Sequence, residues 1–536
     1  MHREPLHDEP LLKPYLYNLD FEMVLKAMDS ILKTYFHYRQ KEVEKVLANP
    51  AYYQSKLLMS NLQRQQSSAY GKTYSFDQIN DYQTFSKALP IIQYKDIYQD
   101  IQKMMDGADN VLVSDKVHWF AKSSGTSVNK SKYIPVTRHY LTHGHLKCTW
   151  TAASVIYNED PSARLFADKN LIMAGSLTKY SPQVTIGDIS AIMLHHFPWI
   201  GRRFATPSFE IALLEDWEEK IKLVAEISSK ERVTLMGGVP TWTIVLFKEI
   251  LRTTGAKNIS EVWPHLKTYI HGGIGLGPYE RELRKYLPSK DVVFREVYNA
   301  TEGYFAIQNE KAVDGMSLMC NHQIFYEFIP AATYTSGDPN QDAITLEEVS
   351  ADTDYVIVIT NSAGLYRYVI GDIVRFSSVR PFKIKVVGRV EQYINAFGEE
   401  LMVCNTDEAV ARICKRHGGI IRDYHVAPKY MTDKDNGCHE WAIEFEKMPT
   451  SIPDFAKALD RELRELNSDY DAKRYKDMAM SPLIIRVLPK GSIDEYMREK
   501  NKYGGQHKLP RLSNDRKIIE NLLGFTNPKS LYLQHH

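Results

Sequence analysis

A repeated pattern of strand, glycine turn and helix is the feature of this sequence that most constrains its fold. Three short strand-like runs are followed by glycines: Leu171–Ala174 by Gly175, Arg232–Met236 by Gly237 and Gly238, and Leu266–Ile270 by His271 and then Gly272 and Gly273. Helical spacing of apolar residues follows the second run, and another helix is expected over residues 278–287. Strands that alternate with helices in this way predict a largely parallel α/β sheet, in which functional loops gather at the carboxyl ends of the strands.

The segments on either side of this region have a different character. The first hundred residues read as helical, whereas residues 320–330 and 355–390 alternate Val, Ile, Tyr and Phe around a turn at Asn361–Gly364. Such alternation favours antiparallel hairpins. We therefore expect an α/β fold with a large N-terminal domain (1–388), holding mixed or parallel sheets and a β subdomain, and a smaller α+β C-terminal domain (389–536).

Composition and charge exclude several classes of protein. A chain of 536 residues is too long for one core, and its formal charge of +1 arises from 67 basic and 66 acidic residues. That balance argues against broad neutralisation of nucleic-acid phosphates. The N-terminus is polar, and no apolar run approaches the ~20 residues of a membrane span. The five cysteines lie far apart without a Cys-x-x-Cys pair, which favours a reducing compartment. From these three observations together we expect a cytoplasmic protein that binds neither nucleic acid nor membranes.

A loop of small hydroxyl residues is the first candidate binding segment. Small residues let backbone N–H groups and hydroxyls approach an anion closely, and nearby lysines add positive charge. Such a loop suits a polyphosphate, although Ser/Gly/Thr runs also make ordinary solvated turns. The candidate residues are Ser123, Ser124, Gly125, Thr126 and Ser127, followed by Lys130 and Lys132.

Glu302 lies in a second candidate segment, Val297–Tyr304, which comes after the expected strand Asp291–Glu296. A carboxylate beside the hydroxyl of Thr301 at a strand end can hold Mg²⁺, which prefers oxygen ligands. The ring of Tyr298 can stack on a nucleobase. The alternative is a plain strand end with a surface glutamate.

Two further segments carry charges that need an explanation. Asp372 follows Gly371 at the end of an apolar strand, where a carboxylate can accept hydrogen bonds from a ribose diol; a turn aspartate bonded to its own backbone is the alternative. Arg367 lies in the same apolar stretch and therefore needs a partner. Near the C-terminus, Gly504–Arg511 places Lys508 in a glycine-containing loop that can deliver its charge to an active site or remain solvated.

Several other motifs are absent or incomplete. No Gly-x-x-x-x-Gly-Lys-Ser/Thr loop occurs, and Gly272–Gly277 misses the dinucleotide-binding spacing because residue 278 is proline. His195 and His196 lack the spacing of a metal-binding helix and fit a pocket wall or the core better. No Gly-x-Ser-x-Gly elbow supports a serine hydrolase.

The candidate segments occur in an order that resembles the adenylate-forming enzymes. A Ser-Ser-Gly-Thr-Ser loop is followed by Tyr-x-x-Thr-Glu, by Tyr-Arg-x-x-x-Gly-Asp and by a Gly-Arg hinge. Within that superfamily the chain resembles a bacterial-type member of the auxin-responsive acyl acid–amido synthetase (Gretchen Hagen) family. The segments that carry this closer resemblance are Lys132–Pro135, Tyr366–Asp372, His439–Glu446 and Gln506–Arg511.

The resemblance implies a role for each candidate residue, with ATP and Mg²⁺ as cofactors. Glu302 would hold Mg²⁺, and Lys508 would neutralise charge during adenylation after the mobile C-terminal domain rotates about residues 388–390. Asn129, Asn299 and His507 depart from the residues usual at their positions. The implied nucleotide-binding residues are Ser123, Ser124, Gly125, Thr126, Ser127, Lys132, Tyr298 (on adenine), Thr301 (on the α-phosphate), Asp372 (on the ribose) and Arg389 (at the hinge).

The implied reaction is ATP-dependent amide synthesis. A carboxylic acid becomes an acyl-AMP with release of pyrophosphate, and the acyl group then passes to an amine, expected to be an amino acid. One alternative is an acyl-CoA ligase, which would require CoA; another is a non-catalytic acyl- or nucleotide-binding protein, against which the joint presence of Glu302, Asp372 and Lys508 argues. An acyl pocket is expected near Val239–Trp242 and His271–Gly273, where core packing is an equal explanation.

Overall fold

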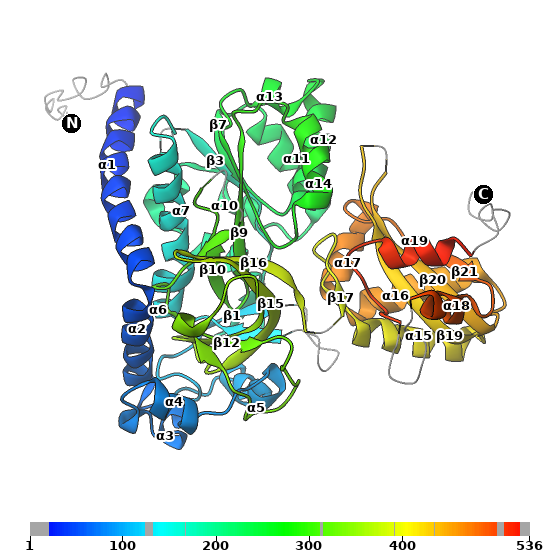
Figure 1. Ribbon diagram of the computed structural model, residues 1–536. Helices are drawn as coiled ribbons and strands as arrows, with labels where there is room; N and C mark the ends of the chain where they lie inside the picture. Colours follow the sequence, from blue (N-terminus) through cyan, green and yellow to red (C-terminus); the bar gives the residue numbers. More distant parts are fainter. Residues whose placement is uncertain are drawn as a thin grey trace, which may run out of the picture.

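The computed structural model describes residues 21–123, 132–163, 165–166, 168–310, 315–390, 392–433, 435–500 and 509–525. A large N-terminal domain lies beside a smaller C-terminal domain (Figure 1). The expected helical start is confirmed, and the two longest of its helices line one side of the N-terminal domain, where the first packs along α7 (Leu146–Glu159). These N-terminal helices are α1 (Phe21–Ala48), α2 (Pro50–Gln65), α3 (Ala69–Thr73), α4 (Tyr82–Ala88) and α5 (Tyr94–Met105).

Within the described residues, a mixed sheet of 12 strands forms the centre of the N-terminal domain. Its parallel part confirms the expected strand–turn–helix repeat and consists, in spatial order, of β6 (Ala205–Thr206), β3 (Lys169–Ile172), β7 (Val233–Gly237), β8 (Thr268–His271) and β9 (Val293–Ala300). The antiparallel strands of the expected β subdomain continue from β9, so both parts share one sheet. They are β10 (Gly303–Ile307), β11 (Met316–Leu318), β16 (Phe382–Arg389), β15 (Tyr368–Val379), β14 (Asp354–Asn361), β12 (Ile324–Pro330) and β13 (Ile344–Thr345).

Burial on both faces explains the apolar runs of the central strands. In β14 every residue after Asp354 is buried, so the strand reads as a continuous apolar run and not as an alternating one. At the parallel end of the sheet, α11 (Trp217–Ser228) packs on α12 (Pro240–Thr254). Pro240 occupies the first turn of α12, and Gly255 ends that helix in the left-handed conformation with φ 72°, both favourable at helix ends.

A second sheet contains the strands on either side of the hydroxyl-rich loop. Its strands, in spatial order, are β2 (Lys132–Pro135), β1 (Trp119–Ser123), β5 (Thr185–Gly187) and β4 (Leu177–Lys179). The antiparallel register of β1 and β2 places Lys132 directly opposite Ser123. The two ends of the loop are therefore held at neighbouring positions of one sheet.

The C-terminal domain is a separate α+β unit. The expected strands are confirmed as β19 (Ile420–Lys429), β20 (Cys438–Lys447) and β21 (Ile484–Leu488), with β19 antiparallel and β21 parallel to β20. A small hairpin, β17 (Tyr393–Ile394) with β18 (Leu401–Met402), faces the N-terminal domain. The helices are α15 (Val403–His417), α16 (Ile452–Leu466), α17 (Ser468–Arg474), α18 (Ser492–Glu499) and α19 (Lys517–Leu523).

The two domains meet through the loop between β17 and β18, residues 395–400, here called the docking loop. Asn395 Nδ2 donates to the Gly273 carbonyl at 2.9 Å, and Thr241 Oγ1 donates to the Phe397 carbonyl at 3.0 Å. The Tyr279 hydroxyl donates to the Ala396 carbonyl. The docking loop is thus fixed against the ends of β7 and β8.

Across the described ranges, every helix is too short or too polar to cross a lipid bilayer.

Candidate active site

A cavity of about 520 Å³ lies where β9, β15, β16, the end of β8 and the docking loop meet. Its volume falls in the roughly 300–1,000 Å³ range of small-molecule sites. It brings together six of the residues expected from the sequence: Ser123, Tyr298, Thr301, Glu302, Asp372 and Arg389. The expected Ser124, Gly125, Thr126, Ser127 and Lys508 lie outside the described residues.

Glu302 is positioned by a tight hairpin. The expectation that the strand ends at Glu296 is wrong: β9 continues to Ala300 because it pairs with β8 along one edge and with β10 along the other. Thr301 and Glu302 form the turn, in which Ala300 faces Gly303. A Cβ at position 303 would lie 2.6 Å from the Tyr140 hydroxyl, so only glycine allows this close packing.

The Glu302 carboxylate is buried without a counter-ion. Its side chain is only 5% exposed, and no lysine or arginine of the described chain forms an ion pair with it. The backbone is fixed by Tyr140, whose hydroxyl donates to the Glu302 carbonyl at 2.7 Å, and by Asn361 at 3.2 Å. Burial raises the pKa of the Glu302 carboxyl, against the pull of Lys132. An isolated buried carboxylate is costly, which indicates that a cation normally accompanies it.

These surroundings fit a magnesium ion. Mg²⁺ takes oxygen ligands and is commonly held by one or two carboxylates together with substrate phosphates and waters. Glu302 supplies a carboxylate and the neighbouring Thr301 a hydroxyl. The Tyr368 hydroxyl is also buried, and its pKa is raised by burial and then by the nearby Glu302 carboxylate, so this hydroxyl lies beside the same site. Glu302 would hold the ion, and the ion would supply charge neutralisation at the phosphates.

Asp372 and Arg389 face each other across two strands. They are register partners of β15 and β16, with Arg389 Nε 2.7 Å from one carboxylate oxygen of Asp372. The Tyr298 hydroxyl donates to the other oxygen at 2.6 Å. Burial opposes the charge of Arg389, but Asp372 and Glu400 outweigh it and raise the pKa of the guanidinium. Burial, followed by Asp372, raises the pKa of Tyr298 well above its ordinary value.

The position of Asp372 differs from both readings of the sequence. It lies inside β15, neither at the end of a strand nor in a turn, directly after Gly371 with φ +98°. The register of β15 against β16 shifts just beyond this point, between Ile373 and Val374. The pairing of β15 with β14 is also irregular at Gly371, whose positive φ favours glycine, and Asp372 directly after it lines the cavity.

Tyr298 and the valines beside it provide an apolar surface. The Tyr298 ring packs on Phe305 with centroids 4.7 Å apart and still lines the cavity. Val386 and Val387, exposed by 39% and 43%, line the same cavity. Apolar lining residues together with a buried carboxylate–arginine pair suit a nucleoside, and stacking of Tyr298 on adenine stays a prediction.

Lys132 lies at the edge of the site. Its register places it opposite Ser123, and its ammonium is 5.8 Å from the centroid of Tyr94. It lines a small adjoining cavity together with Gly371 and Arg389. Lys132 is thus close enough to lower the pKa of Glu302 without forming an ion pair with it.

Lining residues that were not expected from the sequence include Tyr393, Asn395, Glu400 and Asn514. The Tyr393 ring centroid lies 5.4 Å and a Glu400 oxygen 3.6 Å from the guanidinium of Arg389. Tyr393 and Glu400 come soon after the Gly-Arg hinge, and Asn514 comes three residues after the Gly504–Arg511 segment, so each lies near a segment that the sequence had indicated.

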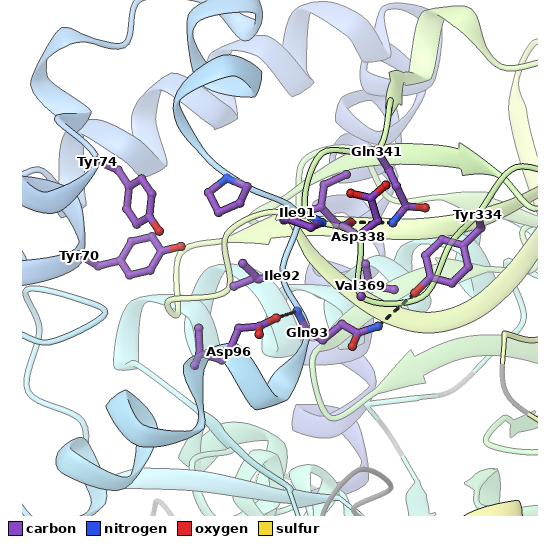
Figure 2. A pocket seen from close by; sticks show the side chains of 14 residues that line it. Tyr70, Tyr74, Ile91, Ile92, Gln93, Asp96, Tyr334, Asp338, Gln341 and Val369 are labelled. Carbon is purple, nitrogen blue, oxygen red and sulfur yellow. Dashed lines mark hydrogen bonds between the residues drawn. The ribbon is translucent and has the colours of Figure 1, made fainter.

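Two other features lie outside this site. His195 and His196 contact Trp119, with ring centroids 4.9 and 4.7 Å away, but His195 is exposed and neither residue lines the cavities described here. The described residues contain no cluster of three or more His, Cys, Asp or Glu side chains suited to a metal. Figure 2 shows a cavity of about 290 Å³ in which Gln93 bonds Tyr334 and Asp96 accepts from the Gln93 backbone, so these polar groups satisfy one another.

Comparison with solved structures defines the class of fold. An acyl acid amido synthetase, AtGH3.15 in complex with 2,4-DB, superimposes with a TM-score of 0.58 at 17% identity, covering 95% of this chain and 98% of the other. A 2-hydroxyisobutyryl-CoA ligase superimposes with a TM-score of 0.53 at 12% identity, covering 89% and 94%. The fold is therefore that of the adenylate-forming enzymes.

Sequence comparison narrows this class to one family. The GH3 family N-terminal domain matches residues 39–195 and 176–292, the central domain residues 317–389 and the C-terminal domain residues 405–517. The chain belongs to the GH3 family of adenylate-forming ligases. An indole-3-acetic acid-amido synthetase of Arabidopsis thaliana is 23% identical over 88% of this chain and 90% of its own length. A 4-substituted benzoates-glutamate ligase of the same plant is 23% identical over 90% and 96%.

Proposed function

We propose that this chain is an ATP-dependent acyl acid–amido synthetase, which activates a small carboxylic acid as its adenylate and joins the acyl group to an amino acid. The observation that carries the proposal is the buried Glu302 carboxylate, which has no ion-pair partner among the described residues, in one cavity with the Asp372–Arg389 pair and Tyr298. Such a site suits a magnesium nucleotide. Family membership then supports the reaction that the nucleotide serves.

The first step is attack at the α-phosphorus of ATP. A carboxylate oxygen of the acid forms the new P–O bond, the bond to the β-phosphate breaks, and pyrophosphate leaves. Asp372 and Arg389 would hold the ribose end, and Ser123, the hydroxyl loop and Lys132 would hold the phosphates. Glu302 would hold Mg²⁺, and Lys508 would add a positive charge. The chain's role is positioning and charge neutralisation, which removes the need for a protein nucleophile.

The second step is transfer of the acyl group to nitrogen. The amine attacks the acyl carbonyl, the C–O bond to AMP breaks, and AMP and a proton are released. Relatives named indole-3-acetic acid-amido synthetase, 4-substituted benzoates-glutamate ligase and jasmonoyl–L-amino acid synthetase support an amino acid as acceptor. An acyl-CoA ligase is the second candidate, supported by the fold shared with the 2-hydroxyisobutyryl-CoA ligase.

Two broader features of the enzyme are part of the proposal. The domain boundary falls at residues 388–390, and rotation of the C-terminal domain about this hinge would serve the two steps in turn. The five cysteines, all within the described ranges, form no disulfide, which supports a reducing compartment such as the cytoplasm.

Release of pyrophosphate tests the proposed reaction. A panel of carboxylic acids, each with Mg²⁺ and ATP, is expected to contain acids that trigger pyrophosphate release. A common amino acid should then increase turnover and yield an amide, while CoA should not yield a thioester. Thioester formation in place of the amide would favour the CoA ligase. No acid-dependent release across a broad panel would contradict adenylation altogether.

Substitution of Lys508 separates the two steps. We expect Lys508→Ala to slow acyl-AMP formation by about 100-fold, because one cation opposite the developing charge is lost. Amide formation from synthetic acyl-AMP and an amino acid should persist. Lys457→Ala, on the exposed face of α16, is the matched control and should leave both steps intact. Unchanged adenylation in Lys508→Ala would remove this residue from its role.

A further inference from the structure

A second cavity, of about 410 Å³, adjoins the nucleotide cavity and is built by both domains. The N-terminal domain contributes residues at the carboxyl ends of β1, β3 and β5 together with Trp217, Val239 and Trp242. The C-terminal domain contributes Ser468, Asp469, Ala472 and Lys473, all from α17. The cavity therefore exists in this form only while the docking loop lies on the N-terminal domain.

The two cavities share a border. Lys122 lines the second cavity and Ser123 the first, and Asp188 and Ile189 are divided in the same way. A molecule in the second cavity would thus lie next to an adenylate bound in the first.

One wall of the second cavity is aromatic and carries a lysine on each side. Trp217 and Trp242 are stacked, with ring centroids 4.1 Å apart and planes 13° from parallel. Lys220 lies 4.3 Å from the Trp217 centroid and donates to the carbonyls of Ala174 and Gly175 at 3.0 and 3.1 Å. The Lys220 ammonium therefore already has hydrogen-bond acceptors within the N-terminal domain.

Lys473 lies on the other side of this wall and differs from its neighbours in having no acceptor. Its ammonium is 5.2 Å from the Trp242 centroid, and no hydrogen bond or ion pair joins it to any part of the chain that the structure describes. By contrast, the adjacent Arg474 is bonded to Asp460 and Lys476 to Glu218. Burial lowers the pKa of Lys473, although the nearby carboxylates of Asp469 and Asp188, which line the same cavity, act in the opposite direction.

The docking loop holds Lys473 in place. At Gly398, where φ is +92°, an added Cβ would lie 2.9 Å from Lys473 Cε and 3.1 Å from its Nζ. The lysine stem thus runs directly over this glycine. The docking loop is itself fixed by Glu399, which accepts from the Phe397 amide at 2.6 Å and from His439 at 2.7 Å.

Val239 and Trp242, where the sequence led us to expect an acyl pocket, line this cavity. We propose that the cavity is instead the acceptor subsite and that Lys473 binds the α-carboxylate of the acceptor amino acid. The assignment rests on the proposed function. The acid uses its carboxylate at the α-phosphorus, so a separate unpartnered cation in the adjoining cavity serves the other substrate. An amino acid carries its nucleophilic nitrogen one carbon from its carboxylate, so Lys473 orients the amine toward the acyl carbonyl. The Trp217–Trp242 wall contacts the amino acid's apolar atoms.

The test compares an amino acid with its α-carboxamide, which keeps the amine and side chain but lacks the negative charge. The most reactive amino acid from a panel of common ones serves as the probe, with amide product as the readout. Wild-type enzyme should prefer the amino acid by roughly 10- to 100-fold in kcat/KM, the value of one charge-assisted hydrogen bond. In Lys473→Met that preference should fall close to one, mainly through KM, and Lys473→Arg should restore part of it.

Two controls separate this inference from the proposed function and from misfolding. Acid-dependent pyrophosphate release, measured without any amine, should persist in Lys473→Met and shows that the variant is folded. Lys457→Met should retain the full preference for the amino acid. A wild-type enzyme that uses both acceptors equally, or a Lys473→Met enzyme that keeps the preference or instead loses affinity for the acid, overturns the assignment. Absence of pyrophosphate release with every acid overturns the proposed function instead.

Discussion

Replacement of Glu302 by Gln is expected to lower the rate of acid-dependent pyrophosphate release by about 100- to 1,000-fold, the usual loss when one electrostatic group is removed from a reacting centre. Gln keeps the shape of the side chain but cannot neutralise Mg²⁺. The concentration of Mg²⁺ required for half-maximal activity should rise with the loss of rate. Glu302→Asp, which keeps the charge, should retain more activity than Glu302→Gln.

Stability distinguishes this catalytic role from a structural one. Because burial raises the pKa of Glu302 above its unfolded value, the ionised carboxylate costs free energy of folding once the pH exceeds that raised pKa. Neutral Gln removes the cost, so Glu302→Gln should be at least as stable as the wild type at pH 7. Glu310→Gln, which alters an exposed carboxylate paired with Lys383, is the control and should keep its activity. Thermal unfolding and the pyrophosphate assay on the same preparations check both statements; a destabilised but active Glu302→Gln would contradict them.

Arg367→Met is expected to lower the free energy of unfolding by about 3–5 kcal/mol, the cost of leaving a buried charge without its partner. Arg367 is 4% exposed and its guanidinium contacts both carboxylate oxygens of Glu327, which is fully buried, with Nη2 to Oε1 at 2.9 Å. The same guanidinium donates to the carbonyls of Ser86 and Leu89 at 2.8 Å each. Its loss would release the N-terminal helical segment from the sheet. Denaturant-induced unfolding measures the change.

Arg375 is the matched control for this substitution. It lies on β15 and pairs with Asp354 at 2.6 Å, but the two side chains are 47% and 38% exposed. Exposed pairs contribute roughly 0–1 kcal/mol, so Arg375→Met should change stability little. A double variant, Arg367→Met with Glu327→Leu, should recover part of the loss because no buried charge remains. Equal losses in Arg367→Met and Arg375→Met would contradict the role assigned to the buried pair.

Local patterns predicted the elements of the fold well. The strand–glycine–helix repeats predicted β3, β7 and β8, and the segments rich in Val, Ile, Tyr and Phe predicted β12, β14 and β15. The single sheet that joins them was not predictable, because it depends on β9 pairing with β8 and β10 at once. Pairing between distant strands leaves no local signal in a single sequence that is read on its own.

The site shows the same division between local and long-range information. Glu302, Asp372 and Arg389 could be predicted because their motifs are local, and the structure places all three in one cavity. Their geometry depends on the hairpin at Thr301 and on the irregular strand after Gly371, both set by neighbouring strands. Lys473 was missed because α17 reads as an ordinary polar helix, and only the docking of two domains brings its ammonium to Trp242.

The path of the substrate's own oxygen tests the central claim most directly. An acid found active in the pyrophosphate assay is labelled with a heavy oxygen isotope in its carboxylate and converted to the amide, and the released AMP and phosphates are examined by mass spectrometry. Attack at the α-phosphorus, followed by transfer to the amine, predicts that one labelled oxygen appears in AMP and none in pyrophosphate. Label in inorganic phosphate with ADP as the nucleotide product, or no label in AMP, would contradict adenylation at this site.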